Sequence, residues 1–424
     1  MSFDEDRKCL SLTSRDEAKK GESMMGNNSR LAKFSPWGVG ALTALFVATG
    51  STGAAFAHDN GNHGKRPPIV LDSSGGFIIG GYHKTGLSPS FPDRTLSCDH
   101  GYVEYFLPAK PRKTSLVLWH SSSAQVWQNR WDGGEGYKDK MLRADYPTYI
   151  WDGPRVGRAN WSCETVTYTP SARDQGNFTA WVFGPAVPAG QVPTPAEFYP
   201  GSQFPYQSPK LEEYWWNATG ARYDEFDIEK NIEIETDAAA IAADSGRLGK
   251  SIVYLTNSAG GLRAMKTTAK ATGNNIKGIY TYESIGYVFP IGDPQVAAAN
   301  ITLCTDPGPA CAFGPLGVTP EDFKKLARLQ ITFAWGDHRP ETYSFVIQSR
   351  LCAKLINEYA AKYHLGGHAE VLKLAEDAGL TGSTHIAFAD MDNDKVAALL
   401  FKFLKKTKLD GYAKADDHGH DHGW

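Results

Sequence analysis

Long blocks of like charge are missing from this sequence. Its 424 residues include 44 lysines and arginines and 47 acidic residues, which gives a net charge of −3. Without a basic block, the chain lacks the long-range field that attracts nucleic acid or anionic lipid. We therefore exclude nucleic acid as a partner and expect a small neutral or weakly polar substrate.

The sequence also lacks an apolar run long enough to span a membrane stably. A spanning helix needs about 20 strongly apolar residues, whereas the apolar part of the best candidate runs only from Val39 to Val47. Arg30 and Lys33 precede it, and the small-residue pattern Ala55-Phe56-Ala57 follows it. This order is typical of a secretory signal peptide cleaved after residue 57.

The predicted signal peptide has two consequences. Residues 1–57 carry no information about the fold, and the mature protein is expected to be exported, either to the periplasm or to the medium. Met24-Met25 would begin a signal peptide of ordinary length, so the charged segment before it is interpreted as an upstream extension.

Cysteine is scarce, with six residues in the chain, of which five follow the predicted cleavage site. An oxidising compartment favours disulfides between some of them. Cys304 and Cys311 bracket a loop rich in proline and glycine and are the first candidate pair. Cys98 with Cys163 is the second, which would leave Cys352 as a buried thiol in a helix. The alternative is that all five are free and buried.

No internal repeat is visible, and short apolar runs alternate with helical patterns. Residues 77–81 and 102–107 alternate in the manner of opening antiparallel strands. Apolar runs of the kind found in strands buried on both faces cover 115–119, 146–151, 251–255, 276–282 and 329–335. Helical patterns cover 237–246 and 394–404. Strands separated by helices predict an α/β fold with a mostly parallel sheet covered on both faces.

Two segments depart from this alternation. Residues 160–231 are rich in proline and aromatic residues, and we predict a cap inserted over one end of the sheet, whose rings line a pocket rather than an exposed patch. The aromatic residues in question are Phe183, Phe198, Tyr199, Phe204, Tyr206, Tyr214, Trp215 and Trp216. The predicted core therefore has two parts, 58–159 and 232–410. Residues 411–424 form a His-rich tail expected to be disordered, and its irregular spacing argues against a catalytic metal.

The most informative junction runs from Leu255 to Met265, where an apolar strand leads through small residues into a helical pattern. Ser258 at its centre has the context of a nucleophile elbow, a strained turn that exposes a serine at the end of a strand. Gly260 supplies the small neighbour that the turn needs after the serine, whereas Thr256 stands where glycine is usual before it. An ordinary strand-to-helix turn is the structural alternative.

A serine nucleophile needs a base, and the expected chain order is serine, acid, histidine. His385, in Gly382-Ser383-Thr384-His385, occupies the expected place before the last helix, whereas His364 and His368 come too early. Two acids compete to orient the imidazole. Glu283 ends the strand after the elbow, Asp337 ends the next one, and whichever is not the partner would order a loop.

An oxyanion hole requires backbone amides near the nucleophile. The amide of Ala259, the residue after the serine, is the first candidate. The second is the amide of Ser122, in His120-Ser121-Ser122-Ser123 at the end of an earlier strand, where small residues allow a close approach to substrate.

Several of these stretches together resemble the bacterial esterase 713-like branch of the α/β-hydrolases. They are residues 75–81, 120–123, 151–158, the Asn-Ser-Ala-Gly elbow at 257–260, 335–338 and 382–385. The resemblance covers most of the mature chain except the cap, and it implies the α/β-hydrolase fold. In that branch the acid is a glutamate after the strand following the elbow, which favours Glu283 over Asp337. A member of that branch carries adjacent cysteines where this chain has Ser122 and Ser123, so the local disulfide is absent here.

The sequence therefore predicts an exported serine hydrolase that cleaves a carboxylic ester without metal or cofactor, through Ser258, His385 and Glu283. The aromatic cap favours an apolar or aryl group on a small ester. The alternatives are a cofactor-free lyase or lactone hydrolase on the same scaffold, and a non-catalytic protein that binds a ligand in the cap or metal in the tail. The oligomeric state, including a homodimer, stays open.

Overall fold

The computed structural model describes residues 66–120, 123–159, 161–166, 172–220, 228–304, 311 and 313–413. Pro67–Trp424 belong to one compact unit. The predicted signal peptide, Ser122 and most of the His-rich tail lie outside the described residues.

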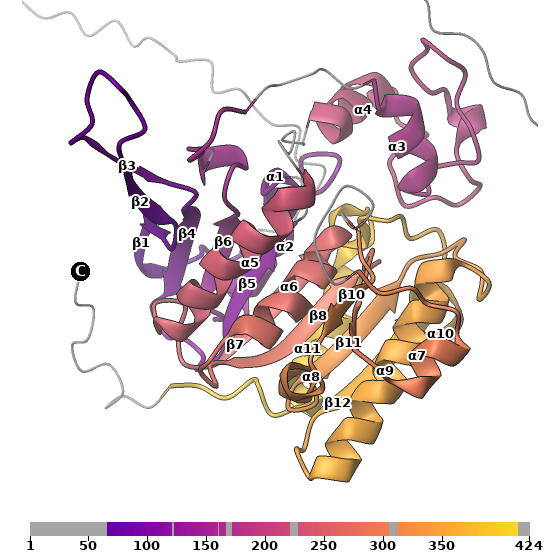
Figure 1. Cartoon of the computed structure of the whole chain (residues 1–424). Helices are drawn as coiled ribbons and strands as arrows, with labels where there is room; N and C mark the ends of the chain where they lie inside the picture. Colours follow the sequence, from indigo (N-terminus) through magenta and orange to yellow (C-terminus); the bar gives the residue numbers. More distant parts are fainter. Residues whose placement is uncertain are drawn as a thin grey trace, which may run out of the picture. The chain divides into compact units, whose positions relative to one another are not determined.

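The core of this unit is an eight-stranded sheet with the order β1-β4-β6-β5-β7-β8-β11-β12 (Figure 1). The strands are β1 Leu71–Ile79, β4 Gly101–Pro108, β5 Ser115–Trp119, β6 Thr148–Asp152, β7 Ile252–Asn257, β8 Ile276–Tyr282, β11 Gln330–Trp335 and β12 His368–Lys373. The first two pairings are antiparallel, and the five from β6 to β12 are parallel. This confirms the predicted mostly parallel sheet with antiparallel opening strands.

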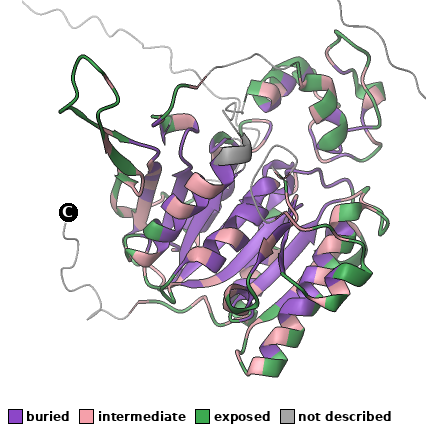
Figure 2. Cartoon of the chain, viewed as in Figure 1, coloured by how far each residue is buried: buried purple, intermediate pink, exposed green. Residues whose placement is uncertain are grey.

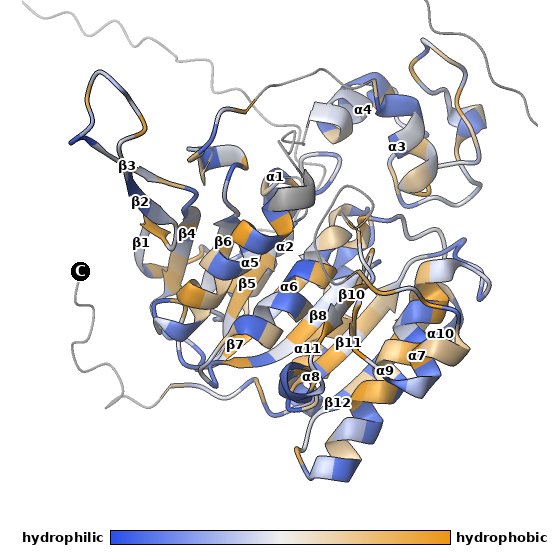
Figure 3. Ribbon diagram, viewed as in Figure 1, coloured by the Kyte–Doolittle hydropathy of each residue, from blue (hydrophilic) through white to orange (hydrophobic). Residues whose placement is uncertain are grey.

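Alternate residues of the central strands enter two separate hydrophobic clusters. In β5, Val117 and Trp119 belong to the cluster that includes residues of α5 Ile228–Asp244, α6 Ala259–Lys270, α8 Pro320–Leu326 and α9 Ser344–Tyr363. Leu116 and Leu118 belong to the cluster that includes residues of α1 Gln125–Gln128, α2 Tyr137–Arg143 and α11 Asn393–Lys406. Helices therefore cover both faces of the sheet, and its central strands are buried and apolar (Figures 2 and 3).

The predicted strands and helices are present, and one strand of the eight-stranded sheet, β12, was not predicted. β12 is an edge strand with an exposed first residue and only partly buried middle residues, so it lacks the apolar run of a buried strand. The remaining elements are short. They are β2 Tyr82–Thr85, β3 Thr95–Cys98, β9 Val288–Pro290, β10 Leu316–Val318, α7 Pro294–Ala298, α10 Leu374–Ala378, and the 3-10 turns η1 Gly157–Ala159 and η4 Ala387–Ala389.

The described part of the proposed cap contains α3 Asp174–Ala180, the 3-10 turn η2 Pro195–Glu197 and α4 Leu211–Gly220. Its largest rings pack against one another with centroid separations between 4.7 and 6.2 Å. The buried members are Phe178, Phe183, Phe198, Phe204 and Trp215. Phe183 and Phe204 also contact Trp131 of the core. These contacts bury the rings, and the idea that cap rings also line a substrate pocket stays a prediction.

Two disulfides confirm the predicted pairing. Cys98 is bonded to Cys163 and Cys304 to Cys311, with Cα separations of 5.0 and 5.9 Å. Cys352 is the free buried thiol in α9. Disulfides persist in oxidising compartments. Among the described residues, no helix has both the length and the apolar character needed to cross a bilayer.

Candidate active site

Ser258 stands at the turn between β7 and α6, at the carboxyl end of a central parallel strand. Its backbone has φ 56° and ψ −134°. A non-glycine residue with this conformation is uncommon and strained, and such strain is concentrated at functional sites. This strained turn between strand and helix is the backbone geometry that a nucleophile elbow requires, and the role of Ser258 as nucleophile stays a prediction.

Close packing around the turn explains its small residues. A Cβ atom on Gly260 would lie 2.7 Å from the backbone oxygen of Trp119, at the end of β5. No side chain fits there without movement of the strand. Thr256, which stands where glycine is usual, is fully buried and lies beside Gly260 without a clash. The turn thus requires a small residue after the serine and tolerates threonine before it.

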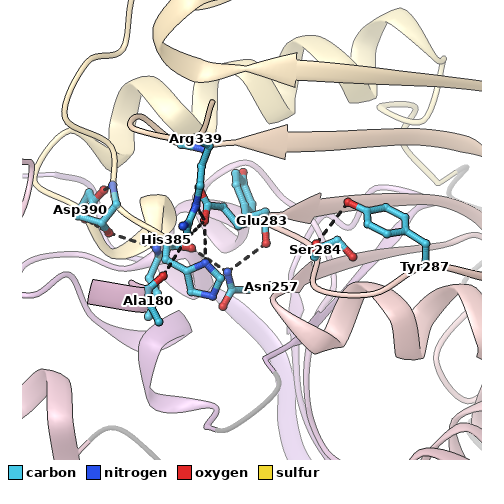
Figure 4. Close-up of polar contacts among 12 residues, drawn as sticks. Ala180, Asn257, Glu283, Ser284, Tyr287, Arg339, His385 and Asp390 are labelled. Carbon is cyan, nitrogen blue, oxygen red and sulfur yellow. Dashed lines mark hydrogen bonds and ion pairs between the residues drawn. The ribbon is translucent and has the colours of Figure 1, made fainter. Parts of the chain in front are cut away.

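Asn257 ties the nucleophile turn to the segment that carries His385. Its side-chain Nδ2 donates to the backbone oxygen of His385 at 2.8 Å and to that of Tyr282 at 3.1 Å. The Ser258 amide also donates to Tyr282 O, at 3.1 Å. Three chain segments, which follow β7, β8 and α10, therefore meet at one point (Figure 4).

The structure brings Glu283 and His385 into direct contact. His385 Nδ1 lies 2.8 Å from Glu283 Oε2, and their side chains are 2% and 1% exposed. Glu283 directly follows β8 and has φ 45°, a second strained residue at this edge of the sheet. A carboxylate that accepts a hydrogen bond from Nδ1 fixes the tautomer in which Nδ1 carries the proton. Nε2 is then the ring nitrogen that can act as a base.

Three donors hold the Glu283 carboxylate. Besides the His385 ring, the amide of Gly336 donates to Oε1 at 2.9 Å, and Arg339 Nε donates to Oε2 at 2.8 Å. Burial alone would raise the pKa of Glu283, but the Arg339 guanidinium and the His385 ring outweigh it and lower the pKa to about 2. Glu283 is therefore a carboxylate at neutral pH.

The surroundings of His385 favour the neutral imidazole. Burial lowers its pKa, Arg339 lowers it further, and the contact with Glu283 opposes both effects. The backbone amide of His385 donates to the oxygen of Trp181 in the cap at 2.9 Å. The preceding residue, Thr384, donates from its amide and its hydroxyl to the buried Asp390, at 2.6 and 2.8 Å.

Asp337, the other candidate acid, has a different set of partners. Its Oδ2 accepts from the Gly382 amide at 2.8 Å, and its own amide donates to Ser383 O at 3.0 Å. Both contacts order the loop that leads to His385 rather than the imidazole itself. This is the loop-ordering role expected for the acid that does not hold the ring.

The structure describes only one of the two predicted oxyanion donors, Ala259. Ala259 is the first residue of α6, where a helix leaves its amides without intrahelical acceptors. Ser122 lies outside the described residues. Next to it, the Ser123 amide donates to His120 Nδ1 at 3.2 Å. Within the described part of the chain, no group of three His, Cys, Asp or Glu residues could hold a metal ion.

Sequence reasoning gave no role to Arg339, Asn257 or Asp390. Arg339 lies two residues beyond Asp337, and Asn257 directly precedes the nucleophile. Nothing in a single sequence distinguishes such residues from surface groups, because their contacts join segments that are far apart along the chain.

No family model and no curated protein matches this sequence. Among solved structures, it is similar to one described as a novel bacterial esterase, with 20% identity, a TM-score of 0.59, and coverage of 81% of this chain and 98% of that chain. An esterase from Pyrococcus furiosus has 11% identity, coverage of 81% and 97%, and a TM-score of 0.37. The naproxen esterase from Bacillus subtilis has 12% identity, coverage of 78% and 92%, and a TM-score of 0.32. The first likeness confirms the α/β-hydrolase fold and agrees with the predicted resemblance.

Proposed function

We propose that this protein is a serine hydrolase that cleaves carboxylic esters, with Ser258 as nucleophile, His385 as base and Glu283 as the acid that orients it. The observation that carries the proposal is the strained turn at Ser258, joined through Asn257 to the buried His385–Glu283 pair. The α/β-hydrolase fold, shared with a bacterial esterase, supports a hydrolase.

In the proposed reaction, Ser258 Oγ attacks the carbonyl carbon of the ester while His385 Nε2 takes the hydroxyl proton. Glu283 accepts the hydrogen bond from Nδ1 and stabilises the imidazolium. Collapse of the tetrahedral intermediate breaks the bond to the alcohol, which leaves with the proton from His385. The product of this half-reaction is an acyl-enzyme.

Water completes the cycle. His385 removes a proton from water, the resulting hydroxide attacks the acyl-enzyme, and Ser258 leaves with the proton as the carboxylic acid forms. In both half-reactions the amide of Ala259, together with that of Ser122, would donate to the developing oxyanion. Both donors belong to the backbone, so a substitution of Ser122 should matter less than one of Ser258.

The substrate and the site of action complete the proposal. A small ester with an apolar or aryl group suits a site beneath an aromatic-rich cap. We also infer export through the signal peptide proposed at 1–57, which agrees with the two disulfides.

The test is hydrolysis of p-nitrophenyl esters together with labelling by a fluorophosphonate. We expect Ser258→Ala to abolish labelling and, with His385→Ala, to lower kcat by about 10⁴-fold or more, because the nucleophile and its base act as one unit. Ser344→Ala and His368→Ala are matched controls, since both residues are exposed and lie outside the site. Ester turnover that survives Ser258→Ala would refute the proposal, and binding without labelling or turnover would favour a ligand-binding protein.

A further inference from the structure

Arg339 lies in the loop after β11 and is largely buried, with its side chain 11% exposed. Lys373 Nζ donates to its backbone oxygen at 2.7 Å. Its guanidinium carbon lies 4.9 Å from the centre of the Tyr343 ring. Core residues therefore contact both parts of Arg339: Lys373 binds its backbone, and Tyr343 packs against its side chain.

The guanidinium contacts the acid and the cap at the same time. Nε and Nη2 lie 2.8 and 2.7 Å from Glu283 Oε2. Nη2 also donates to the backbone oxygen of Ala180, the last residue of α3, at 2.7 Å (Figure 4). A single nitrogen thus joins the carboxylate that holds the imidazole to the first cap helix.

The next residue of the cap makes the second link. Trp181 O accepts the hydrogen bond from the His385 amide at 2.9 Å. Two consecutive cap carbonyls are therefore hydrogen-bonded to the site. Ala180 O accepts from the guanidinium of Arg339, and Trp181 O accepts from the backbone amide of His385. Movement of this cap segment would have to break both bonds or displace Arg339 and His385 with it.

We propose that Arg339 is a positioning residue that couples the cap to the Glu283–His385 pair and, by sharing Glu283 Oε2 with the imidazole, disfavours the positively charged ring. The inference rests on the proposed function, because Arg339 would act on His385, the base of that reaction. It goes beyond the triad by making the placement of the acid depend on the cap.

The electrostatic part of the argument follows from the shared oxygen. Two charged or titratable groups face the His385 ring, Glu283 from the end of β8 and Arg339 from the loop after β11, while the cap offers His385 a backbone carbonyl. Tyr343 and Tyr199 are the other titratable groups that interact electrostatically with Arg339. Because the guanidinium occupies the same Oε2 that stabilises an imidazolium, it disfavours the protonated ring.

A purely structural role for Arg339 is the competing explanation. An arginine that only neutralises a buried carboxylate would, when removed, lower activity by a similar factor at every pH. An arginine that also tunes His385 would move the acidic limb of the pH profile of kcat/KM, since that limb reports the pKa of the base.

The experiment uses the full chain with Arg339→Met, Arg339→Lys and the matched control Arg350→Met, which removes an exposed arginine paired with Glu341. Two readouts are needed. One is kcat/KM for p-nitrophenyl acetate from about pH 4.5 to pH 9, which spans the usual range of histidine. The other is amide hydrogen exchange in the cap peptide 174–183.

We expect Arg339→Met to move the acidic limb to higher pH and to speed exchange in the cap peptide. Arg339→Lys should keep the limb near its wild-type position, because the positive charge remains, yet still loosen the cap, because a single ammonium lacks the guanidinium fork. Arg350→Met should change neither readout.

An acidic limb that stays at the wild-type pH in Arg339→Met, or cap exchange that stays at the wild-type rate, overturns the inference. Should Arg339→Met fail to fold, cap exchange in Arg339→Lys decides in the same way. Failure of the proposed function looks different, because the wild type itself would show neither ester turnover nor labelling at Ser258.

Discussion

Two buried carboxyl groups flank the segment that carries His385, and their pKa values are shifted in opposite directions. Glu283 is 1% exposed and Asp390 is fully buried, yet the pKa of Glu283 is lowered to about 2 while burial raises the pKa of Asp390 to about 8. Neutral donors face Asp390, namely the amide and hydroxyl of Thr384 and the indole of Trp131. A guanidinium faces Glu283.

The comparison shows that burial favours the neutral form of an acid and that a nearby cation favours the anion. Asp390, whose pKa is raised, fixes the backbone of the His385 segment. The anion, Glu283, contacts the imidazole itself and can stabilise its positive charge. Two carboxyl groups with similar burial therefore take different tasks, and substitutions that remove charge should separate them.

The largest expected effect is on turnover by Glu283→Gln. An amide keeps the shape of the side chain but cannot stabilise the imidazolium or enforce the correct tautomer, so kcat should fall by about 10⁴-fold. Steady-state ester hydrolysis at neutral pH measures the loss, and circular dichroism checks that the fold is retained. A fall of less than about 10-fold would remove Glu283 from the triad.

Asp390→Asn should act on stability and its pH dependence instead. The folded pKa of about 8 lies above the ordinary unfolded value of about 3.9, so between these two values the folded state holds a proton that the unfolded state has lost. The free energy of unfolding therefore contains a contribution that is fully present below about pH 4 and falls by up to about 1.4 kcal/mol per pH unit as the pH rises toward 8.

Asparagine has no proton to lose in either state, so the free energy of unfolding of the variant should not fall with pH through this group, and the variant should gain stability relative to the wild type as the pH rises toward 8. It should also lose about 1–2 kcal/mol at all pH values, because one of the donors around residue 390 would face an amide NH₂. Urea unfolding at about pH 5, 6 and 7 measures both effects. Wild-type and variant stabilities that run parallel over this range would show that Asp390 is ionised in the folded protein.

The smallest effect is expected for Asp337→Asn. The variant keeps one oxygen, which can accept from Gly382, but loses the charge and the oxygen that accepts from the His338 amide, so stability should fall by about 1 kcal/mol while kcat changes less than about 10-fold. The same ester assay and urea unfolding provide the measurement. A loss of turnover as large as that of Glu283→Gln would transfer the role of the acid to Asp337.

Much of the layered core could be predicted because buried parallel strands leave a local signature. The strands predicted at 115–119 and 276–282 coincide with β5 and β8, since each is a short and mostly apolar run. The edge strand β12 was missed because only some of its residues are buried. The cap was recognised by composition, but its internal packing depends on ring contacts between residues up to 37 positions apart, such as Phe178 and Trp215.

The sequence by itself determined the kind of sheet, the turn at Ser258 and the disulfide pairs, because each depends on a local pattern or on a short list of possible partners. It left Glu283 and Asp337 equivalent until a family resemblance favoured one. Only the tertiary structure decided which carboxylate contacts His385 and which cation holds that carboxylate. The physical reason is that Glu283 and His385 are 102 residues apart, and a hydrogen bond forms only where folding brings the two groups within about 3 Å.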